Sequence, residues 1–251
     1  MPSETEHTSC HGLLLLPGVT CAHPEVSAQG WPAAPDAEAP STDLDALEIP
    51  SSAVTQDYLK AIYTLGEWDQ PGASASDLAA RLGVGAPTVT EHVQRLAGAG
   101  LVNYQPYRRI TLTAEGRQVA LAMVRRHRLM ETYLAWRLGY SWDEVHDDAE
   151  RLEHAVSPVL MQRIDANLDH PRRDPHGDPI PQADGTVVVP PAHRMDQVQP
   201  GTRVRVVRIS DADPELLREL TSAGIGLDVE LDTAASGLSA QAATAIWVVA
   251  A

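Results

Sequence analysis

Residues 76–97 read SDLAARLGVGAPTVTEHVQRLA, and this stretch decides the fold of the region around it. Its first part predicts a short helix, with Ser74 or Ser76 as the N-cap. Gly83 lies in a tight turn, and Pro87 stands in the first turn of a second helix that ends near residue 97. Apolar residues recur on facing sides of both helices. The stretch therefore predicts a helix-turn-helix.

The residues on either side extend this unit to 51–113. A helical pattern begins near Ser52, because apolar residues then recur at 3.6-residue spacing. Downstream, residues 101–104 and 110–112 are short strand-like runs separated by a turn that contains two arginines. A strand-turn-strand after a helix-turn-helix is the wing of a winged helix. We therefore predict a winged helix-turn-helix DNA-binding domain over residues 51–113.

The second helix of such a unit lies in the major groove of double-stranded DNA and offers its first turns to base edges. Basic residues beside it are placed to meet phosphates. The predicted DNA-binding residues are Ala86, Pro87, Thr88, Thr90, Glu91, Arg95, Arg108 and Arg109. Some winged helices bind proteins instead, so an ordinary interaction module is the alternative at this point.

The charge distribution favours DNA over that alternative. The 251 residues carry a formal net charge of −15, which taken whole argues against a nucleic-acid partner. Residues 54–140, however, hold 10 basic and 7 acidic residues, whereas residues 1–53 hold 8 acids and no Lys or Arg. Phosphate contacts need cations locally rather than over the whole chain. The basic block coincides with the predicted DNA-binding domain.

A second constellation lies in residues 142–154. On a helix, His146, Glu150, Glu153 and His154 share one face. His127 and Glu131 form an i, i+4 pair upstream, and Asp57 lies on the first helix. Oxygen and nitrogen ligands without a thiolate suit Mn²⁺ or Fe²⁺ in six-coordinate geometry. An acidic solvated helix face is the plainer interpretation. A hydrolytic di-metal enzyme is a third, but no nucleophile elbow or phosphate loop accompanies the ligands.

The rest of the chain divides by composition. Residues 1–50 are rich in Pro, Ala, Ser and Asp and predict a disordered acidic arm. Cys10, Cys21 and three histidines lie in this arm, but the composition around them cannot bury a metal site. Residues 114–170 predict helices over about 114–137, 142–155 and 158–168. Residues 171–200 predict a Pro-rich linker. Residues 201–251 predict strands around Val204–Ile209 and Ile246–Val249 and a helix over 213–222.

Cysteine usage and hydropathy bear on location. With two cysteines, both in the predicted arm, no disulfide framework is expected, and a reducing, cytoplasmic setting is the simplest interpretation. No apolar run reaches the length of a membrane-spanning helix, so no membrane partner is expected.

These motifs together resemble the diphtheria toxin repressor family of metal-dependent transcriptional regulators. The resemblance covers about residues 52–251 and includes the winged helix, VRRHRLME at 124–131, HDDAERLEH at 146–154 and DPHGDPIP at 174–181. It implies a mainly α fold with small β elements. A winged helix is followed by a helical metal-binding and dimerisation domain and by a C-terminal SH3-like (FeoA-like) β domain, abbreviated after Asp232.

The resemblance also implies ligands. The primary metal site would comprise Asp57, Glu150, Glu153 and His154, and the second site His127, Glu131 and His146, with Asp213 from the β domain; Asp211 and Glu215 are the alternatives to Asp213. The iron-responsive branch typically has Met and Cys where this chain has Asp57 and Glu150, which resembles the manganese-responsive branch. One difference is Lys60, which stands where some manganese regulators carry a second acid.

The resemblance implies a function as well. We expect a homodimeric Mn²⁺-dependent repressor, not an enzyme, that binds operator DNA and controls manganese homeostasis genes. The alternatives are an Fe²⁺-dependent repressor of iron uptake genes with the same fold, a Mn²⁺-dependent hydrolase, and a metal buffer without DNA binding.

Overall fold

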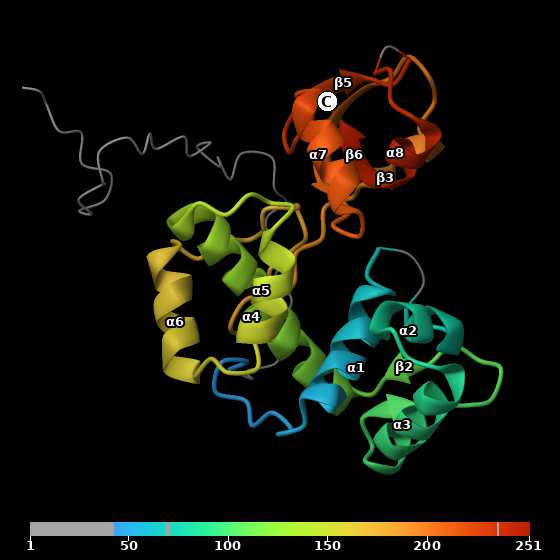
Figure 1. Cartoon of the computed structure of the whole chain (residues 1–251), viewed down its shortest axis with the longest axis vertical. Coiled ribbons are helices and arrows are strands. Elements are labelled where there is room, and N and C mark those ends of the chain that lie inside the picture. Colours follow the sequence, from blue (N-terminus) through green and yellow to red (C-terminus); the bar gives the residue numbers. More distant parts are fainter. Residues whose placement is uncertain (1–42, 69–70, 235) are drawn as a thin grey trace, which may run out of the picture. The chain divides into compact units, whose positions relative to one another are not determined.

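The computed structural model describes residues 43–68, 71–234 and 236–251 (Figure 1). The predicted acidic arm, apart from its last residues, and the Cys and His residues within it lie outside the described residues. Among the residues that are described, no helix is both long enough and apolar enough to span a membrane.

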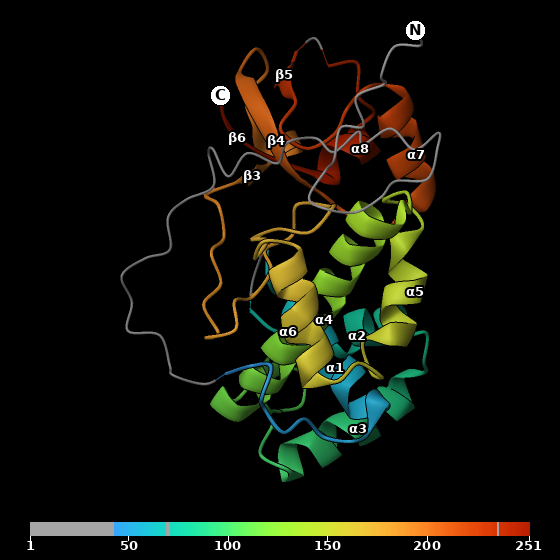
Figure 2. The same ribbon diagram turned by 90° about the vertical axis from the view of Figure 1, so that its left-hand side faces the viewer.

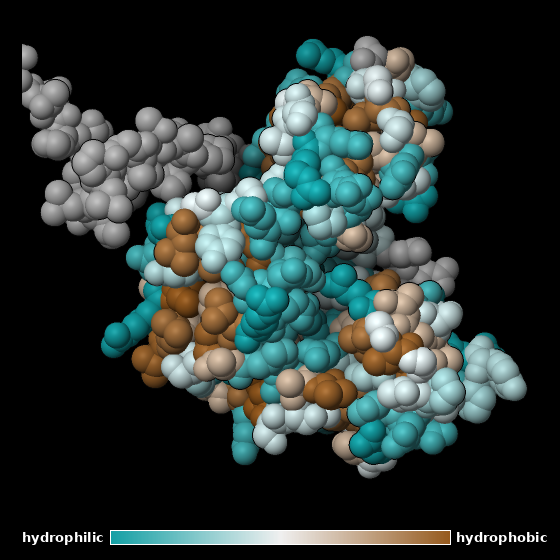
Figure 3. Space-filling model, in the orientation of Figure 1, coloured by the Kyte–Doolittle hydropathy of each residue, from teal (hydrophilic) through white to brown (hydrophobic). Residues whose placement is uncertain are grey.

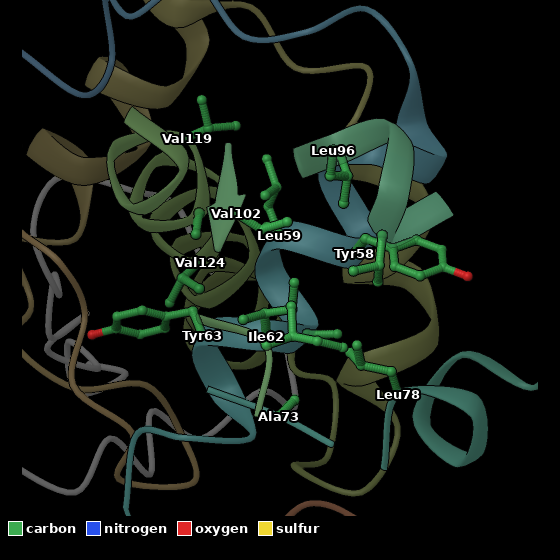
Figure 4. Close-up of a cluster of buried hydrophobic side chains, with 14 of the residues drawn as sticks. Tyr58, Leu59, Ile62, Tyr63, Ala73, Leu78, Leu96, Val102, Val119 and Val124 are labelled. Atoms are coloured by element: carbon green, nitrogen blue, oxygen red, sulfur yellow. The ribbon is translucent and has the colours of Figure 1, made fainter. Parts of the chain in front are cut away.

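The winged helix is confirmed, and local capping explains its boundaries. It comprises α1 (Ala53–Thr64), α2 (Ala75–Leu82), α3 (Ala86–Gly98), β1 (Val102–Asn103) and β2 (Thr111–Leu112). Ser52 caps α1, and Ser74 forms a capping box with Asp77 at the start of α2. The strands pair antiparallel, Val102 opposite Leu112. Figure 4 shows Leu59 and Ile62 of α1 directed into a core that α3, β1 and α4 complete.

Three helices form the next region. Thr113 caps α4 (Ala114–Leu138), and Gly139 ends it in the left-handed conformation that favours glycine. The helices α5 (Val145–Leu152) and α6 (Pro158–Asn167) pack along α4 (Figure 2). Leu129, Met161 and Ile164 lie in their shared core. The structure makes α5 shorter than the predicted 142–155, so that Glu153 is its C-cap and His154 lies beyond it.

The last residues of the predicted arm are packed rather than disordered. Leu44 is buried in the winged-helix core, and Asp45 is 3% exposed. The two oxygens of Asp45 accept hydrogen bonds from Arg125 of α4 at 3.0 and 3.1 Å. Asp165 accepts a further bond from the same guanidinium at 2.9 Å. The prediction of disorder is therefore wrong for residues 43–50, because it weighed composition and not this buried partner 80 residues away.

The prediction of an extended Pro-rich linker over residues 171–200 is also wrong for the first half of that segment. Asp174, His176, Asp178 and Ile180 are all buried. Gly177 has φ +91°, and a Cβ there would lie 2.1 Å from the carbonyl oxygen of Val207. Only glycine allows this close approach, which holds the segment against the following domain. The frequency of proline indicated an extended backbone, but Asp174 and Asp178 between the prolines form buried ion pairs with arginines.

The C-terminal domain is a small sheet with two helices. Its strands are β3 (His193–Arg194), β4 (Arg203–Ile209), β5 (Glu230–Asp232) and β6 (Ile246–Ala250), in the order β3-β6-β4-β5. A short 3₁₀ helix, η1 (Met195–Gln197), follows β3, and α7 (Pro214–Ser222) and α8 (Ala240–Thr244) complete the domain. Val206, Ile209 and Val248 lie in its core. The strand β3 falls within the stretch predicted as linker, and β5 and α8 were not predicted.

Candidate metal centre

Four of the predicted ligands come together as one group. Asp57 of α1 meets Glu150, Glu153 and His154 of the α5 segment, and one ligand atom from each lies within 4.8 Å of the others. We call these residues the four-ligand group. Asp57 belongs to the winged helix, whereas the other three belong to the region after it, 93 to 97 positions further along the chain. The group therefore joins the two regions.

Gln56 fixes the tautomer of His154. The amide nitrogen Nε2 of Gln56 donates to the carbonyl oxygen of Pro50, which can only accept. Its amide oxygen Oε1 therefore faces Nδ1 of His154, 2.6 Å away, and His154 has to donate from Nδ1. The neutral imidazole then presents the lone pair of Nε2 to the four-ligand group.

The residues of the four-ligand group fit a divalent cation. Oδ1 of Asp57 is buried and has no hydrogen-bond donor, and it lies 3.1 Å from Nε2 of His154. Neighbouring ligands of one six-coordinate cation lie about 3 Å apart. Burial raises the pKa of the Asp57 carboxyl, and the positive charge of Lys60 offsets this only in part. The missing positive partner of this oxygen is what a bound metal would supply.

We expect Gln56→Met to weaken Mn²⁺ binding about tenfold, because outer residues that orient a histidine ligand typically contribute ten- to hundredfold in affinity. Methionine fills the same volume but cannot accept from Nδ1, so His154 loses its fixed tautomer. Titration of the full chain with Mn²⁺, followed by the EPR signal of the free ion, measures this. Gln94→Met, at an exposed position of α3, is the control. Equal Mn²⁺ affinity of Gln56→Met and wild type would contradict the assigned role.

Lys60 is an unpredicted member of this neighbourhood. Its Nζ atom lies 2.8 Å from Oε1 of Glu150 and 2.6 Å from Oε1 of Glu153. Burial opposes ionisation of Glu150, but the Lys60 charge lowers the pKa of that carboxyl below its ordinary value. Sequence reasoning placed Lys60 one turn after Asp57 but did not predict that it would contact both glutamates.

The predicted second site adjoins the four-ligand group, because His127 and His146 can offer ligand atoms together with Glu150. Nε2 of His127 lies 3.0 Å from Oε1 of Glu131, and Nδ1 of His146 lies 3.2 Å from the same oxygen. Burial disfavours the charged imidazole, yet Glu131 raises the pKa of His127 to about 10. Against the effect of burial, His127 lowers the pKa of Glu131 well below its usual value. A metal that binds His127 at neutral pH therefore has to release its proton.

The structure does not bring Asp213 to this group. Its Oδ1 accepts from the backbone N–H groups of Glu215 and Leu216, so Asp213 is the N-cap of α7. Asp211 lies beside the group instead, with Oδ2 3.4 Å from Nδ1 of His146. Glu131, His146 and Asp211 can offer ligand atoms within 4.8 Å of one another. The correction follows from a local rule, since an Asp directly before a helix is a preferred cap.

Asp174, His176 and Asp178 are functional candidates that sequence reasoning missed. Asp174 and His176 can form a ligand group with Glu131. Burial and the negative charge of Asp178 raise the pKa of Asp174 to about 7. A cavity of about 320 Å³ touches Glu131 and Asp174 as well as Asp57 and Glu150, so the groups border one space. The run DPHGDPIP, with two acids and a histidine between prolines, was the available signal.

The predicted DNA-binding residues lie on the exposed side of α3 and on the wing. Ala86, Pro87, Thr88, Glu91 and Arg95 are exposed, and Thr90 is half-buried. Arg108 is exposed beside Tyr107, which has φ +63° in the turn between β1 and β2. Arg109 instead donates to the backbone carbonyls of Pro71 and Gly72, so it braces the base of the wing. The ring of His92 stacks on Tyr58 of α1 at 4.9 Å.

Comparison with protein families gives three matches that follow the domain order of the structure. Residues 51–110 match the iron dependent repressor N-terminal DNA binding domain, and residues 113–182 match the iron dependent repressor metal binding and dimerisation domain. Residues 193–240 match the FeoA domain, whose first residues are those of β3.

Individual relatives agree with these matches. The diphtheria toxin repressor of Corynebacterium glutamicum is 34% identical over 189 residues, which span 71% of this chain and 82% of that protein. The iron-dependent repressor IdeR of Mycobacterium tuberculosis is 39% identical over 127 residues, 51% of this chain and 55% of that protein.

Solved structures are similar as well. A manganese-dependent transcriptional repressor in complex with manganese is 49% identical with a TM-score of 0.71, and the match covers 78% of this chain and all of that one. The manganese regulator SloR is 29% identical with a TM-score of 0.64, over 78% of this chain and 98% of that one.

Proposed function

This chain belongs to the diphtheria toxin repressor family of metal-dependent transcriptional repressors, and we propose that Mn²⁺ is the metal that activates it. As a member of that family it is a regulator of transcription and not an enzyme. The genes that it represses would be those of manganese homeostasis.

One observation carries the proposal: the four-ligand group takes Asp57 from the winged helix and the other ligands from the α5 segment. When bound, the divalent cation supplies the positive charge that these four side chains share. Asp57 then holds α1 to α5, and α1 packs through Leu59 and Ile62 against the helices that position α3. Ligation would thereby favour one orientation of the recognition helix, the orientation that binds the operator.

The choice of Mn²⁺ rests on the chemistry of the ligands. None of the four ligands carries a sulfur atom, and three of them are carboxylates. Carboxylate oxygens suit Mn²⁺, whereas softer sulfur ligands favour other metals. Fe²⁺ is the second candidate, favoured by the relatives described as iron-dependent repressors, and it would activate repression of iron uptake genes through the same residues.

We infer that the repressor acts as a homodimer. Val159 and Leu160 of α6 and Leu152 of α5 are between 40% and 58% exposed, and Figure 3 shows hydrophobic side chains gathered over α6. An apolar face of this kind on the metal-binding region suits a two-fold contact between copies. Two recognition helices would then meet successive major grooves, about 34 Å apart.

The DNA contact would combine phosphate binding with readout of shape. Arg95 and Arg108 are exposed beside the predicted groove-facing turns of α3. Those first turns hold Pro87, Thr88 and Glu91 but neither Lys nor Arg. Base discrimination would therefore depend on small contacts and on the deformability of the operator.

Fluorescence anisotropy of the full-length protein with promoter fragments of manganese uptake genes tests the proposal. Buffered Mn²⁺ should raise operator affinity by about 50-fold or more over chelator, within the range of typical allosteric coupling. Equal affinity under both conditions would contradict it. If Fe²⁺, added without oxygen, activates binding at a lower free concentration than Mn²⁺, the iron assignment replaces the manganese one.

A further inference from the structure

Lys60 is the single lysine of the sequence, whose other 18 basic residues are all arginines. It lies one turn after Asp57 on α1, and its side chain is 8% exposed. An ammonium group is a compact point charge, whereas a guanidinium is broad and planar. The chain therefore places its one compact cation in the interior, at the four-ligand group.

The ammonium group holds the oxygens that a metal needs. Nζ lies 2.8 Å from Oε1 of Glu150 and 2.6 Å from Oε1 of Glu153. The other oxygen of Glu153 is taken, because Nδ1 of His127 lies 2.6 Å from Oε2. The Oε1 atom of Glu153 is thus the one left for a metal, and it also lies 3.6 Å from Nε2 of His154. Lysine and metal would share this atom.

We propose that Lys60 is a resident competitor for the metal, which keeps Glu150 and Glu153 in place in the metal-free protein and is displaced when the metal binds. This inference rests on the four-ligand group being the activating site. Lys60 would then set the free metal concentration at which the repressor switches, since binding has to overcome both the contact and the repulsion between like charges.

Charge balance favours the exchange of lysine for metal in this group. Asp57, Glu150 and Glu153 supply three carboxylates, and Lys60 neutralises one of these charges in the metal-free protein. A divalent cation in its place brings one more positive charge to the same carboxylates, which offsets the loss of the ammonium contact.

The test compares wild type with Lys60→Met, which keeps an unbranched apolar side chain one atom shorter than lysine and removes the charge. Mn²⁺ affinity, measured by EPR of the free ion, should rise about tenfold or more, while the melting temperature of the metal-free protein should fall. A purely structural lysine would lower both quantities. Lys60→Gln should give the same pair of changes if Lys60→Met folds poorly. Arg81→Met removes a positive charge from the exposed edge of the same cavity and should alter affinity less than twofold.

A second measurement needs no variant. With lysine as the only isotope-labelled residue, the metal-free protein gives one ε-methylene signal, which should move on addition of one equivalent of diamagnetic Cd²⁺. An unmoved signal, or a Lys60→Met affinity equal to or below that of wild type, would overturn the proposal while leaving the metal site standing. Failure of wild type to bind Mn²⁺ at all would overturn the metal site, and this inference with it.

Discussion

Asp57→Ala is expected to lower Mn²⁺-dependent operator affinity by about a hundredfold, near the upper end of typical coupling between two sites. Asp57 is the one member of the four-ligand group that belongs to the winged helix. Without it Glu150, Glu153 and His154 can still bind a metal weakly, but nothing then ties that metal to α1. Anisotropy titrations at buffered Mn²⁺ measure the loss.

The same substitution should leave the metal-free fold intact. Because burial raises the pKa of Asp57 in the folded state, the folded chain is stabilised by this group below its unfolded-state pKa and loses that contribution as the pH rises through the folded-state pKa. At pH 7 the carboxylate is therefore unfavourable, and its removal should keep or slightly raise the melting temperature. Asp147→Ala, at an exposed acid of α5, is the matched control for operator binding. Metal-dependent binding retained by Asp57→Ala would contradict the assigned role.

Arg128→Met should destabilise the protein by about 3–5 kcal/mol, the usual consequence of removing one partner from a buried ion pair. The Arg128 guanidinium donates to both oxygens of Glu67 and to the carbonyl oxygen of Pro179. It also lies 3.7 Å from Asp174 and 3.6 Å from Asp178. Methionine would leave three buried acids without this charge. Urea denaturation of the metal-free protein measures the change.

A double variant separates charge from packing at the same position. Glu67→Gln combined with Arg128→Met should recover part of the loss, since the two residues are in direct contact and their effects are not additive. Arg151→Met, which removes an exposed partner of Asp148, should change stability by less than about 1 kcal/mol. A loss for Arg128→Met no larger than that of Arg151→Met would show that the buried network contributes little.

The parts of the structure that local rules govern could be predicted from the sequence. Thr113 and Gly139 bound α4 as the cap preferences require. His146, Glu150, Glu153 and His154 could be grouped because helical spacing places them on one face, although the helix itself is shorter than expected. The family resemblance supplied Asp57, which no spacing along the chain links to α5.

The parts that escaped prediction depend on partners distant in the sequence. Asp45 is ordered by Arg125, and Asp178 is ordered by Arg128 and by Arg208, whose Nε lies 2.7 Å from Oδ1 of Asp178. Amino-acid composition does not indicate such pairing. The segments that contain Asp45 and Asp178 were therefore predicted to be a disordered arm and an extended linker. The choice of Asp213 over Asp211 was a different kind of error, because the capping preference that identifies Asp213 was already available.

Anomalous diffraction tests most directly whether a bound metal joins α1 to α5. A crystal of the full-length protein would be soaked in Mn²⁺, and diffraction would be recorded on both sides of the manganese absorption edge. An anomalous difference peak is expected at a position bounded by Oδ1 of Asp57, Nε2 of His154 and the carboxylates of Glu150 and Glu153. Crystals of Asp57→Ala should lose that peak or weaken it strongly. Manganese density confined to the group around His127, Glu131 and His146, with none beside Asp57, would contradict the claim that the metal joins α1 to α5.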